Sequence, residues 1–324
     1  MGEYNEVNDL KSRVLDFQPN TLTVIHKDIP GWGNRPHQFN NAQVGAIQAA
    51  VLANRPLLVR GDPGLGKTQL APALATALKL DFFSISVHAN TEINDLLYSV
   101  DHLKRLNNAQ GNSSSLEVSE CIVPGVLWKA IAPDVKAETP EENTTRLDHR
   151  LTRGALVLID EIDKADASLP NALLEVLNTG TITVDAIGQT VQGKAERPVV
   201  VIITSNDDRE LPAAFLRRCA TLDIRLMDGE DGVAQLMEIY DAHKNRIDKM
   251  ASGGEVIEVS EVKTLANDVI RIRCEQKKKH DYAPGTSEFL DVLTVLSQLP
   301  DSQRETQKKL VVDVLLKKRN KSEE

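Results

Sequence analysis

The stretch RGDPGLGKTQL, Arg60 to Leu70, lies where the apolar run RPLLV gives way to the segment APALATALKL. Its glycine and lysine residues have the spacing G-x-x-x-x-G-K-T. A loop that wraps a phosphate must turn its backbone N–H groups inward, which requires positive φ at some positions and no Cβ at others. Gly61, Gly64 and Gly66 supply that freedom. The stretch therefore predicts a phosphate-binding loop between a strand and a helix.

The side chains of this loop suit a nucleoside triphosphate. Lys67 would reach the β- and γ-phosphates, and the Thr68 hydroxyl would ligate Mg²⁺ at a helix N-terminus that already favours anions. A plain strand-to-helix turn is the alternative, and the strand–loop–helix context argues against it. ATP and Mg²⁺ are the expected cofactors, and the expected nucleotide contacts are Gly61, Asp62, Pro63, Gly64, Leu65, Gly66, Lys67, Thr68 and Gln69.

Composition bounds the class of protein. The 324 residues can form one large or two ordinary domains. Apolar residues at 41% and charged residues at 26% are ordinary for a soluble globular protein. No apolar run approaches transmembrane length, and the polar start MGEYNEVNDLK is not a secretory signal. The sequence therefore predicts a cytoplasmic protein that does not enter a membrane.

Charge and cysteine content exclude two further classes. The net charge of −9 argues against a broad nucleic-acid-binding surface. Cys121, Cys219 and Cys274 lie far apart and form no C-x-x-C pair. They are expected to be reduced thiols, rather than a metal site or a disulfide framework.

Two domains are expected after an irregular lead-in over residues 1–40, where the segment DIPGWGNRP would break regular structure. Within 41–226, five apolar runs, RPLLVR, DFFSISV, ALVLID, RPVVVIITSN and CATLDIRL, alternate with helical segments. This pattern predicts an α/β fold with a parallel sheet buried on both faces. Four amphipathic helices then predict a smaller all-helical domain over 227–318, before a charged tail at 319–324.

The run LVLIDEID carries the second half of the expected site. Asp160 ends an apolar strand and would hold Mg²⁺ through its water shell, and Glu161 would polarise the attacking water. Acids after a strand often cap a helix instead, a role open to Asp163 or Asp166. The phosphate loop about 90 residues upstream favours the catalytic interpretation.

Two later segments add candidates. VVVIITSND ends a strand at Asn206, whose neutral amide could orient the lytic water. ELPAAFLRRCATLDI places Arg217 and Arg218 at the end of a short helix. An arginine there can reach the γ-phosphate held by a neighbouring subunit. The alternative is a surface pair that neutralises a helix C-terminus.

Together these residues resemble the AAA+ ATPases, and more narrowly the MoxR-like branch of the helix-2-insert clade. GDPGLGKT is similar to the Walker A motif, LVLIDEIDKAD to Walker B, IITSN to sensor 1 and LPAAFLRRC to the arginine-finger segment. DLLYSVDHLKRLNNAQ followed by VPGVLWKAI resembles the region after the second strand of MoxR-type proteins. The resemblance implies a P-loop core with a parallel sheet flanked by helices, followed by a helical lid.

The resemblance also implies roles for individual segments. Arg218 matches the arginine finger, with Arg217 as the alternative. An insert over about 100–128 and a hairpin over about 180–198 would face a central pore and move a bound partner. Since each site would borrow an arginine from its neighbour, the resemblance implies a homo-oligomer, usually a hexameric ring.

One departure from the family concerns the lid. AAA+ lids often carry a sensor-2 arginine, but the corresponding stretch, DYAPGTSEFLDVLTVLSQLPDSQ, contains no Lys or Arg. Ser287 occupies the position of that arginine, which puts direct coupling of the lid to the γ-phosphate in doubt. Arg271 and Arg273 are possible substitutes.

The resemblance implies an ATP-driven motor that remodels a separately encoded protein, with von Willebrand A domain proteins as the expected partner class. One alternative is a nucleic-acid translocase subunit resembling McrB, against which the acidic charge argues. The other is a nucleotide-gated scaffold with little turnover, against which Glu161 and Asn206 argue.

Overall fold

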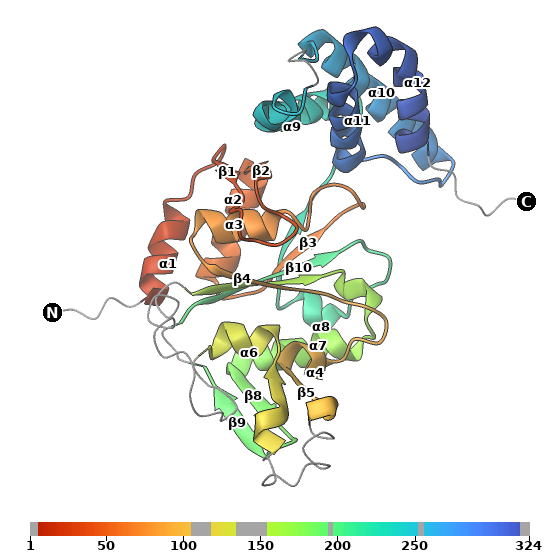
Figure 1. The fold of residues 1–324 in the computed structure, drawn as a ribbon. Helices are drawn as coiled ribbons and strands as arrows, with labels where there is room; N and C mark the ends of the chain where they lie inside the picture. The colour runs from red at the N-terminus through yellow and green to blue at the C-terminus, as the bar shows by residue number, and fades with distance from the viewer. Residues whose placement is uncertain (1–5, 105–117, 134–153, 194–196, 252–255, 318–324) are drawn as a thin grey trace, which may run out of the picture. The chain divides into compact units, whose positions relative to one another are not determined.

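The computed structural model describes residues 6–104, 118–133, 154–193, 197–251 and 256–317 (Figure 1). The chain divides into two compact units. The first unit consists of Met1–Pro19, Asn40–Arg60 and Leu74–Leu222, and the second of Asn20–Phe39, Gly61–Ala73 and Asp223–Glu324. Neither unit is a continuous stretch of sequence, in contrast to the linear boundaries expected above.

The first unit is built on a five-stranded sheet in the order β11-β3-β10-β7-β4. The predicted α/β fold with a parallel sheet is confirmed, because β10 pairs in parallel with β3 and β7, and β7 with β4. Each of the five apolar runs forms one strand: β3 (Leu57–Arg60), β4 (Asp81–Ser86), β7 (Ala155–Asp160), β10 (Val199–Ser205) and β11 (Ala220–Asp223).

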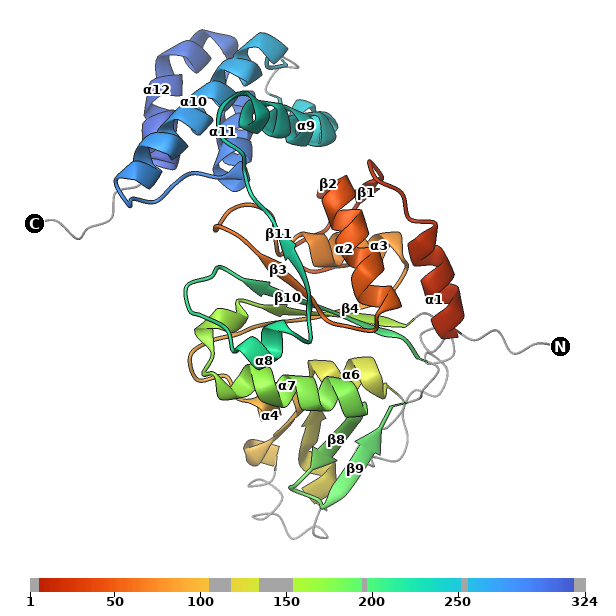
Figure 2. The same ribbon diagram turned by 180° about the vertical axis from the view of Figure 1, so that it is seen from behind.

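Helices cover both faces of this sheet. Figures 1 and 2 show α2 on one face and α6 and α7 on the other. The central strands β7 and β10 are buried along nearly their whole length, which explains why both read as continuous apolar runs rather than alternating ones. The described helices that lie wholly in this unit are α1 (Glu6–Leu15), α2 (Asn41–Leu52), α4 (Ile93–Leu97), α6 (Val126–Ile131), α7 (Ser168–Thr179) and α8 (Ala213–Leu216). The helix after the phosphate loop, α3 (Leu70–Ala77), begins in the second unit and ends in the first.

Two short hairpin-like ladders complete the first unit. In the first, β5 (Tyr98–Val100) pairs with β6 (Ile122–Pro124), and in the second, β8 (Thr181–Val184) pairs with β9 (Gln189–Gln192). Both ladders are antiparallel. The family resemblance implies an insert over about 100–128 and a hairpin over about 180–198. Strand β5 ends where that insert begins, β6 lies within the insert, and β8 and β9 lie within the hairpin segment. Residues 105–117 and 194–196 lie outside the described residues.

The expectation of an irregular lead-in over residues 1–40 is wrong. Residues Glu6–Leu15 form α1, because Leu10 and Val14, one helical turn apart, are both buried. Further along, β1 (Leu22–Val24) and β2 (Pro36–Gln38) form an antiparallel pair. The Pro- and Gly-rich segment between these strands makes the turns that connect them instead of breaking the structure.

The described residues of the second unit's C-terminal segment form four helices, as predicted. They are α9 (Gly229–Asp248), α10 (Val259–Lys278), α11 (Thr286–Gln298) and α12 (Asp301–Leu316). Their apolar residues recur at three- and four-residue spacing and meet in one core that includes Leu236, Val269 and Phe289. The β1–β2 pair and the segment Gly61–Ala73 also belong to this unit.

His243 on α9 is a buried titratable group in the second unit, with only 6% of its surface exposed. Burial, together with the charges of Arg246, His37 and Arg35, lowers the pKa of His243 to about 4. Among the described residues, its Nδ1 atom has no hydrogen-bond partner. The imidazole is therefore neutral in the folded protein at neutral pH.

This burial predicts a pH-dependent stability. Between about pH 6.5 and about pH 4 the unfolded chain binds a proton at His243 that the folded chain does not, so the free energy of unfolding should fall as pH falls. The loss is at most about 1.4 kcal/mol per pH unit in that window. Urea unfolding measures the free energy of unfolding at about pH 7 and at about pH 5. The difference between these two values should be smaller for His243→Gln than for wild type. His88→Gln, a change at an exposed histidine, is the control and should leave this pH-dependent difference as in wild type. A difference in His243→Gln equal to that of wild type would contradict the low pKa of His243.

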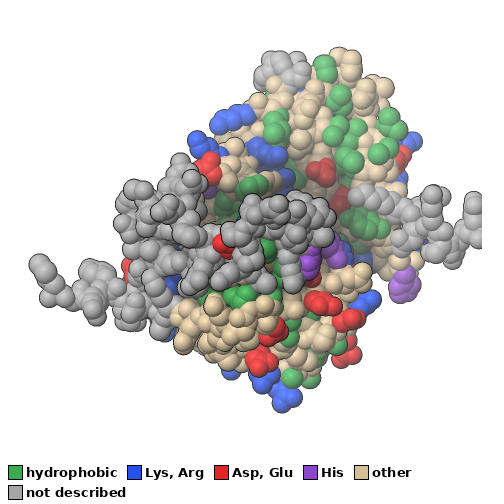
Figure 3. All heavy atoms as spheres, turned by 60° about the horizontal axis from the view of Figure 1, so that its bottom comes forward, with side chains coloured by type: hydrophobic (Ala, Val, Ile, Leu, Met, Phe, Trp, Pro, Cys, Tyr) green, Lys and Arg blue, Asp and Glu red, His purple; other side chains and the backbone are tan. Residues whose placement is uncertain are grey.

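The surface shows no single dominant charge on the face in Figure 3, where acidic and basic side chains of the described residues are interspersed. Among the described helices, none combines the length and the apolar character needed to cross a membrane.

Candidate functional site

The phosphate loop follows directly after β3, and its glycines have backbone conformations that other residues rarely adopt. Gly61, Gly64 and Gly66 have φ angles of 143°, 76° and 82°. A Cβ atom on Gly61 would lie 2.1 Å from the backbone oxygen of Ile224, so no other residue fits there without moving the backbone. The loop conformation therefore depends on glycine at the positions where the motif has it.

Lys67 is folded over this loop. Only 6% of its surface is exposed. Its Nζ atom donates to the backbone oxygens of Gly61, at 2.6 Å, and Asp62, at 2.9 Å. The ammonium group is thus held beside the backbone that would surround a phosphate.

Three other loop side chains are directed toward the protein. Leu65 is buried in the apolar core of the second unit. Gln69 donates from Nε2 to the backbone oxygen of Pro36, at 2.7 Å. Asp62 forms ion pairs with Arg273 and Lys277. These side chains contact the second unit and thereby shape the loop, whose backbone N–H groups are the expected phosphate ligands.

In the first unit, a threonine fixes the two consecutive acids after β7. The Thr204 hydroxyl, 1% exposed as a residue, donates to Asp160 Oδ1 at 2.5 Å and accepts from the Glu161 N–H at 2.9 Å. Glu161 has a left-handed backbone, with φ of 60°, which turns the chain at the end of the strand. The sequence analysis did not identify Thr204, although it lies within the quoted segment IITSN.

The Glu161 carboxylate has two neighbours. Oε1 accepts from Asn206 Nδ2 at 3.2 Å, so the structure brings together two of the predicted catalytic residues. Oε2 accepts from Lys164 Nζ at 2.5 Å. This hydrogen bond is the main reason that the pKa of Lys164 is raised. Lys164 was not predicted, and its position three residues after Glu161 in a helical turn is the signal that could have found it.

Neither Asp163 nor Asp166 caps a helix with its side chain. Asp163 is buried, and its Oδ2 atom accepts from the N–H groups of Asn206, at 3.1 Å, and Asp208, at 3.0 Å. It therefore fixes the turn after β10 that presents Asn206. Asp166 is exposed, and α7 begins after Ala167 without a side-chain cap. The helix-capping alternative for these two acids is wrong.

The two arginines after α8 differ in their surroundings. Both are exposed. Arg217 donates from Nε to the backbone oxygen of Ala213, at 3.4 Å, and its own backbone oxygen accepts from Arg55, at 3.0 Å. For the Arg218 side chain, no hydrogen bond or ion pair is found with any residue that the structure describes. Arg218 is the one free to extend toward another molecule.

A magnesium ion would have few protein ligands here. Among the described residues, no group of three or more His, Cys, Asp or Glu side chains could hold a metal. Mg²⁺ bound to a nucleotide is usually held by one or two protein oxygens together with phosphates and waters. The Thr68 hydroxyl and the Asp160 carboxylate are oxygen donors of the kind that such an ion takes.

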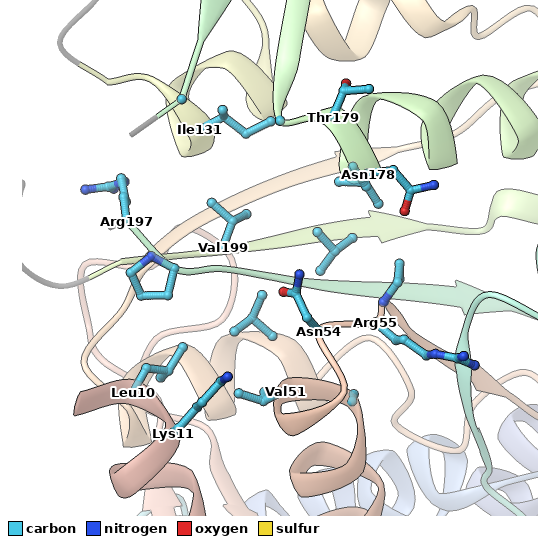
Figure 4. Close-up of a pocket in the computed structure, with 18 of the residues that line it drawn as sticks. Leu10, Lys11, Val51, Asn54, Arg55, Ile131, Asn178, Thr179, Arg197 and Val199 are labelled. Carbon is cyan, nitrogen blue, oxygen red and sulfur yellow. The ribbon is translucent and has the colours of Figure 1, made fainter. Parts of the chain in front are cut away.

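The first unit also has a pocket of about 450 Å³, which is separate from the site formed by Asp160, Glu161 and Asn206 (Figure 4). Its lining includes Pro56 and Val199, at the amino-terminal ends of β3 and β10. Asp160 and Asn206, in contrast, lie at or just beyond the carboxyl ends of β7 and β10. The pocket is therefore at the opposite edge of the sheet from the carboxylate site.

Residues 56–219 match the family model described as AAA domain (dynein-related subfamily). The matched range contains the phosphate loop, the acids after β7, Asn206 and both arginines. It covers half of the chain and lies wholly within the predicted α/β core, residues 41–226.

Curated relatives align over a similar range. The chaperone protein ClpB of Enterococcus faecalis is 29% identical over 191 residues, which is 58% of this chain and 18% of that protein. ClpB of Staphylococcus epidermidis is 26% identical over 187 residues, or 56% of this chain and 18% of that protein. The chain thus spans less than a fifth of the length of these relatives. A solved structure of an ATPase candidate from Cytophaga hutchinsonii is 16% identical, covers 97% of this chain and 87% of that chain, and has a TM-score of 0.41.

Proposed function

We propose that this chain, which belongs to the AAA domain family (dynein-related subfamily), hydrolyses ATP. The energy of hydrolysis would be used to remodel a separately encoded protein. The observation that carries the proposal is the contact between Glu161 and Asn206 beside Asp160. A carboxylate that can accept a proton, held by a neutral amide, is the arrangement needed to activate and orient a water molecule.

In this proposal, Lys67 and the backbone N–H groups of the phosphate loop bind the phosphates of ATP. Glu161 takes a proton from the water whose oxygen attacks the γ-phosphorus, and the bond from that phosphorus to ADP breaks. Asn206 orients the water, and Arg218 of a neighbouring copy stabilises the charge of the transition state. Mg²⁺, held by Thr68 and Asp160, would neutralise charge on the phosphate oxygens.

The proposal includes a ring of identical subunits of the MoxR type, with six as the expected number. The exposed Arg218, which has no side-chain partner among the described residues, supports it. The two relatives named above are chaperones by name, which supports a remodelling role. The MoxR-like motifs point to a protein bearing a von Willebrand A domain as the partner.

A trapping experiment tests this function. Glu161→Gln, purified from the native cell with ATP present, should retain the protein on which the ring acts, and Lys67→Ala, which should not bind ATP, provides the matched control. A distinct protein partner recovered only with Glu161→Gln would support the proposal. Recovery of nucleic acid, with ATP turnover that DNA stimulates and salt suppresses, would instead identify a translocase. ATP binding without turnover by wild type would identify a scaffold.

Thr204 should contribute to turnover by positioning the two acids. Thr204→Val keeps the side-chain volume but removes the hydrogen bonds to Asp160 and to the Glu161 N–H. A hydrogen bond to a charged group contributes about 1.5 to 3 kcal/mol, so kcat should fall about tenfold to a hundredfold with a much smaller change in ATP affinity. Thr204→Ser, which restores the hydroxyl, should recover most of the loss. A kcat for Thr204→Val equal to that of wild type would contradict this role.

A further inference from the structure

Arg273 on α10 is a buried charge that contacts the phosphate loop within the second unit. The residue is fully buried. Its guanidinium donates to the carboxylate of Asp62, and to the backbone oxygen of Pro284 at 2.9 Å. A guanidinium is charged at every relevant pH, and burying it is costly unless it is paired. The Asp62 carboxylate is its ion-pair partner.

Lys277, one turn further along α10, contacts the same carboxylate. Its Nζ atom lies 2.9 Å from Asp62 Oδ2. Burial raises the pKa of the Asp62 carboxyl, but the hydrogen bond and charge of Lys277, together with Arg273, outweigh it, so the pKa lies below its usual value. The carboxylate is therefore charged at neutral pH, and both ion pairs weaken only when the solution becomes acidic enough to protonate it.

Arg271 is directed elsewhere. Its side chain is 59% exposed, and it pairs with Asp268, at 3.0 Å, and Glu275, at 3.2 Å, on its own helix. Of the two arginines that could replace a sensor-2 residue, only Arg273 reaches the loop.

The first turn of α11 holds the loop from a second direction. The backbone oxygen of Gly64 accepts from the Ser287 N–H at 2.9 Å, from Thr286 Oγ1 at 2.7 Å and from Ser287 Oγ at 3.1 Å. Ser287, which occupies the place of the family's lid arginine, therefore binds the backbone of the loop. Together, Arg273, Lys277, Thr286 and Ser287 make what we call the loop clamp, which holds Asp62 and Gly64.

Lys67 connects the clamp to the phosphate site. Its Nζ atom donates to the backbone oxygen of Asp62, the residue whose side chain Arg273 holds. A phosphate that takes the ammonium of Lys67 would compete for this contact and change the position of the Asp62 backbone. The carboxylate of Asp62 would pass that change to α10, and Gly64 would pass it to α11.

We propose that Arg273 is a positioning residue that, through Asp62, couples the state of the phosphate loop to α10 without contacting the nucleotide. The inference rests on the proposed binding of ATP by the loop. The stretch that should hold a lid arginine has Ser287 in its place, and the proposal assigns the coupling role of that arginine to the ion pair of the buried Arg273 with Asp62.

Hydrogen exchange of the full-length protein, with and without a non-hydrolysable ATP analogue at saturating concentration, tests this coupling. Arg273→Met keeps a long side chain for packing but removes the charge, and Arg271→Met is the matched control on the same helix. In wild type and in Arg271→Met, the analogue should slow exchange in the loop, residues 61–69, in the first turn of α11 and in α10 around residues 273–277. In Arg273→Met it should still slow exchange in the loop and in the first turn of α11, which Gly64 contacts, but not in α10. The affinity for the analogue should be about tenfold weaker, as expected for the loss of a charge-assisted hydrogen bond.

Asp62→Asn provides the second variant if Arg273→Met does not fold. The Asp62 side chain is half-exposed, and this variant should show the same separation of loop and α10. The double variant should bind the analogue no more weakly than the weaker single variant, because both changes remove one interaction. Protection of α10 in either single variant equal to that in wild type would overturn the coupling. Absence of loop protection in wild type would overturn the proposed nucleotide site, and this inference with it.

Discussion

Glu161→Gln is expected to bind ATP nearly as tightly as wild type and to hydrolyse it about two to four orders of magnitude more slowly. The amide oxygen of glutamine can still accept from Asn206, whereas its NH2 group cannot accept from the exposed Lys164. An amide cannot take the proton of the attacking water, however, and that proton transfer is the contribution of a positioned base. The variant separates binding from chemistry.

Calorimetry should therefore report similar dissociation constants for wild type and Glu161→Gln, and a phosphate-release assay should report the loss of turnover. Asp166→Asn provides the control, since Asp166 is an exposed acid five residues further along the chain. Turnover of Glu161→Gln at the wild-type rate would mean that Glu161 only begins the turn after β7.

The sheet could be predicted because its inner strands β3, β7 and β10 are buried on both faces. β7 and β10 form uninterrupted apolar runs that polar turn residues terminate, and such runs leave few alternatives. The helices α9 to α12 were equally predictable from their apolar spacing. In contrast, β1 and β2 have three residues each, and their formation depends on pairing with each other across a Pro- and Gly-rich turn. Local sequence carries little of that information.

The same distinction applies to the site. The acids after β7 and Asn206 were identified because each directly ends a strand. Thr204 was not, because its role follows from the register of β10 on β7, in which Ile203 lies opposite Ile159 and so places Thr204 beside Asp160. Register between strands far apart in sequence is a tertiary property that no local pattern records.

Arg273 could have been distinguished from Arg271 by helical position. The two residues are separated by about 200° around a helix, so they face nearly opposite directions. Arg273 follows the buried Val269 by four residues and Ile270 by three, which places it on the apolar face. An arginine on such a face requires a partner, and the sequence alone does not reveal that the partner is Asp62 of the loop.

Arg218→Ala is expected to bind ATP like wild type and to lose about a thousandfold or more in turnover, the contribution of an arginine supplied by a neighbouring subunit. The structure favours Arg218 over Arg217 for this role, because the Arg217 side chain donates to Ala213 on its own helix. Arg217→Ala is therefore the matched control and should lose much less.

Mixing two inactive variants tests whether Arg218 acts across an interface. Lys67→Ala should not bind ATP, because no other residue of the loop can place a positive charge against the β- and γ-phosphates, and Arg218→Ala should bind without hydrolysing. A mixed ring contains interfaces where an intact Lys67 faces an intact Arg218, so activity should return on mixing once subunits exchange. Subunit exchange can be measured separately with fluorescent labels. Two results would show that Arg218 does not act in the neighbouring subunit's site. The first is that no activity returns on mixing although subunit exchange is demonstrated. The second is that wild-type turnover per chain does not change with protein concentration in a range where the protein is monomeric.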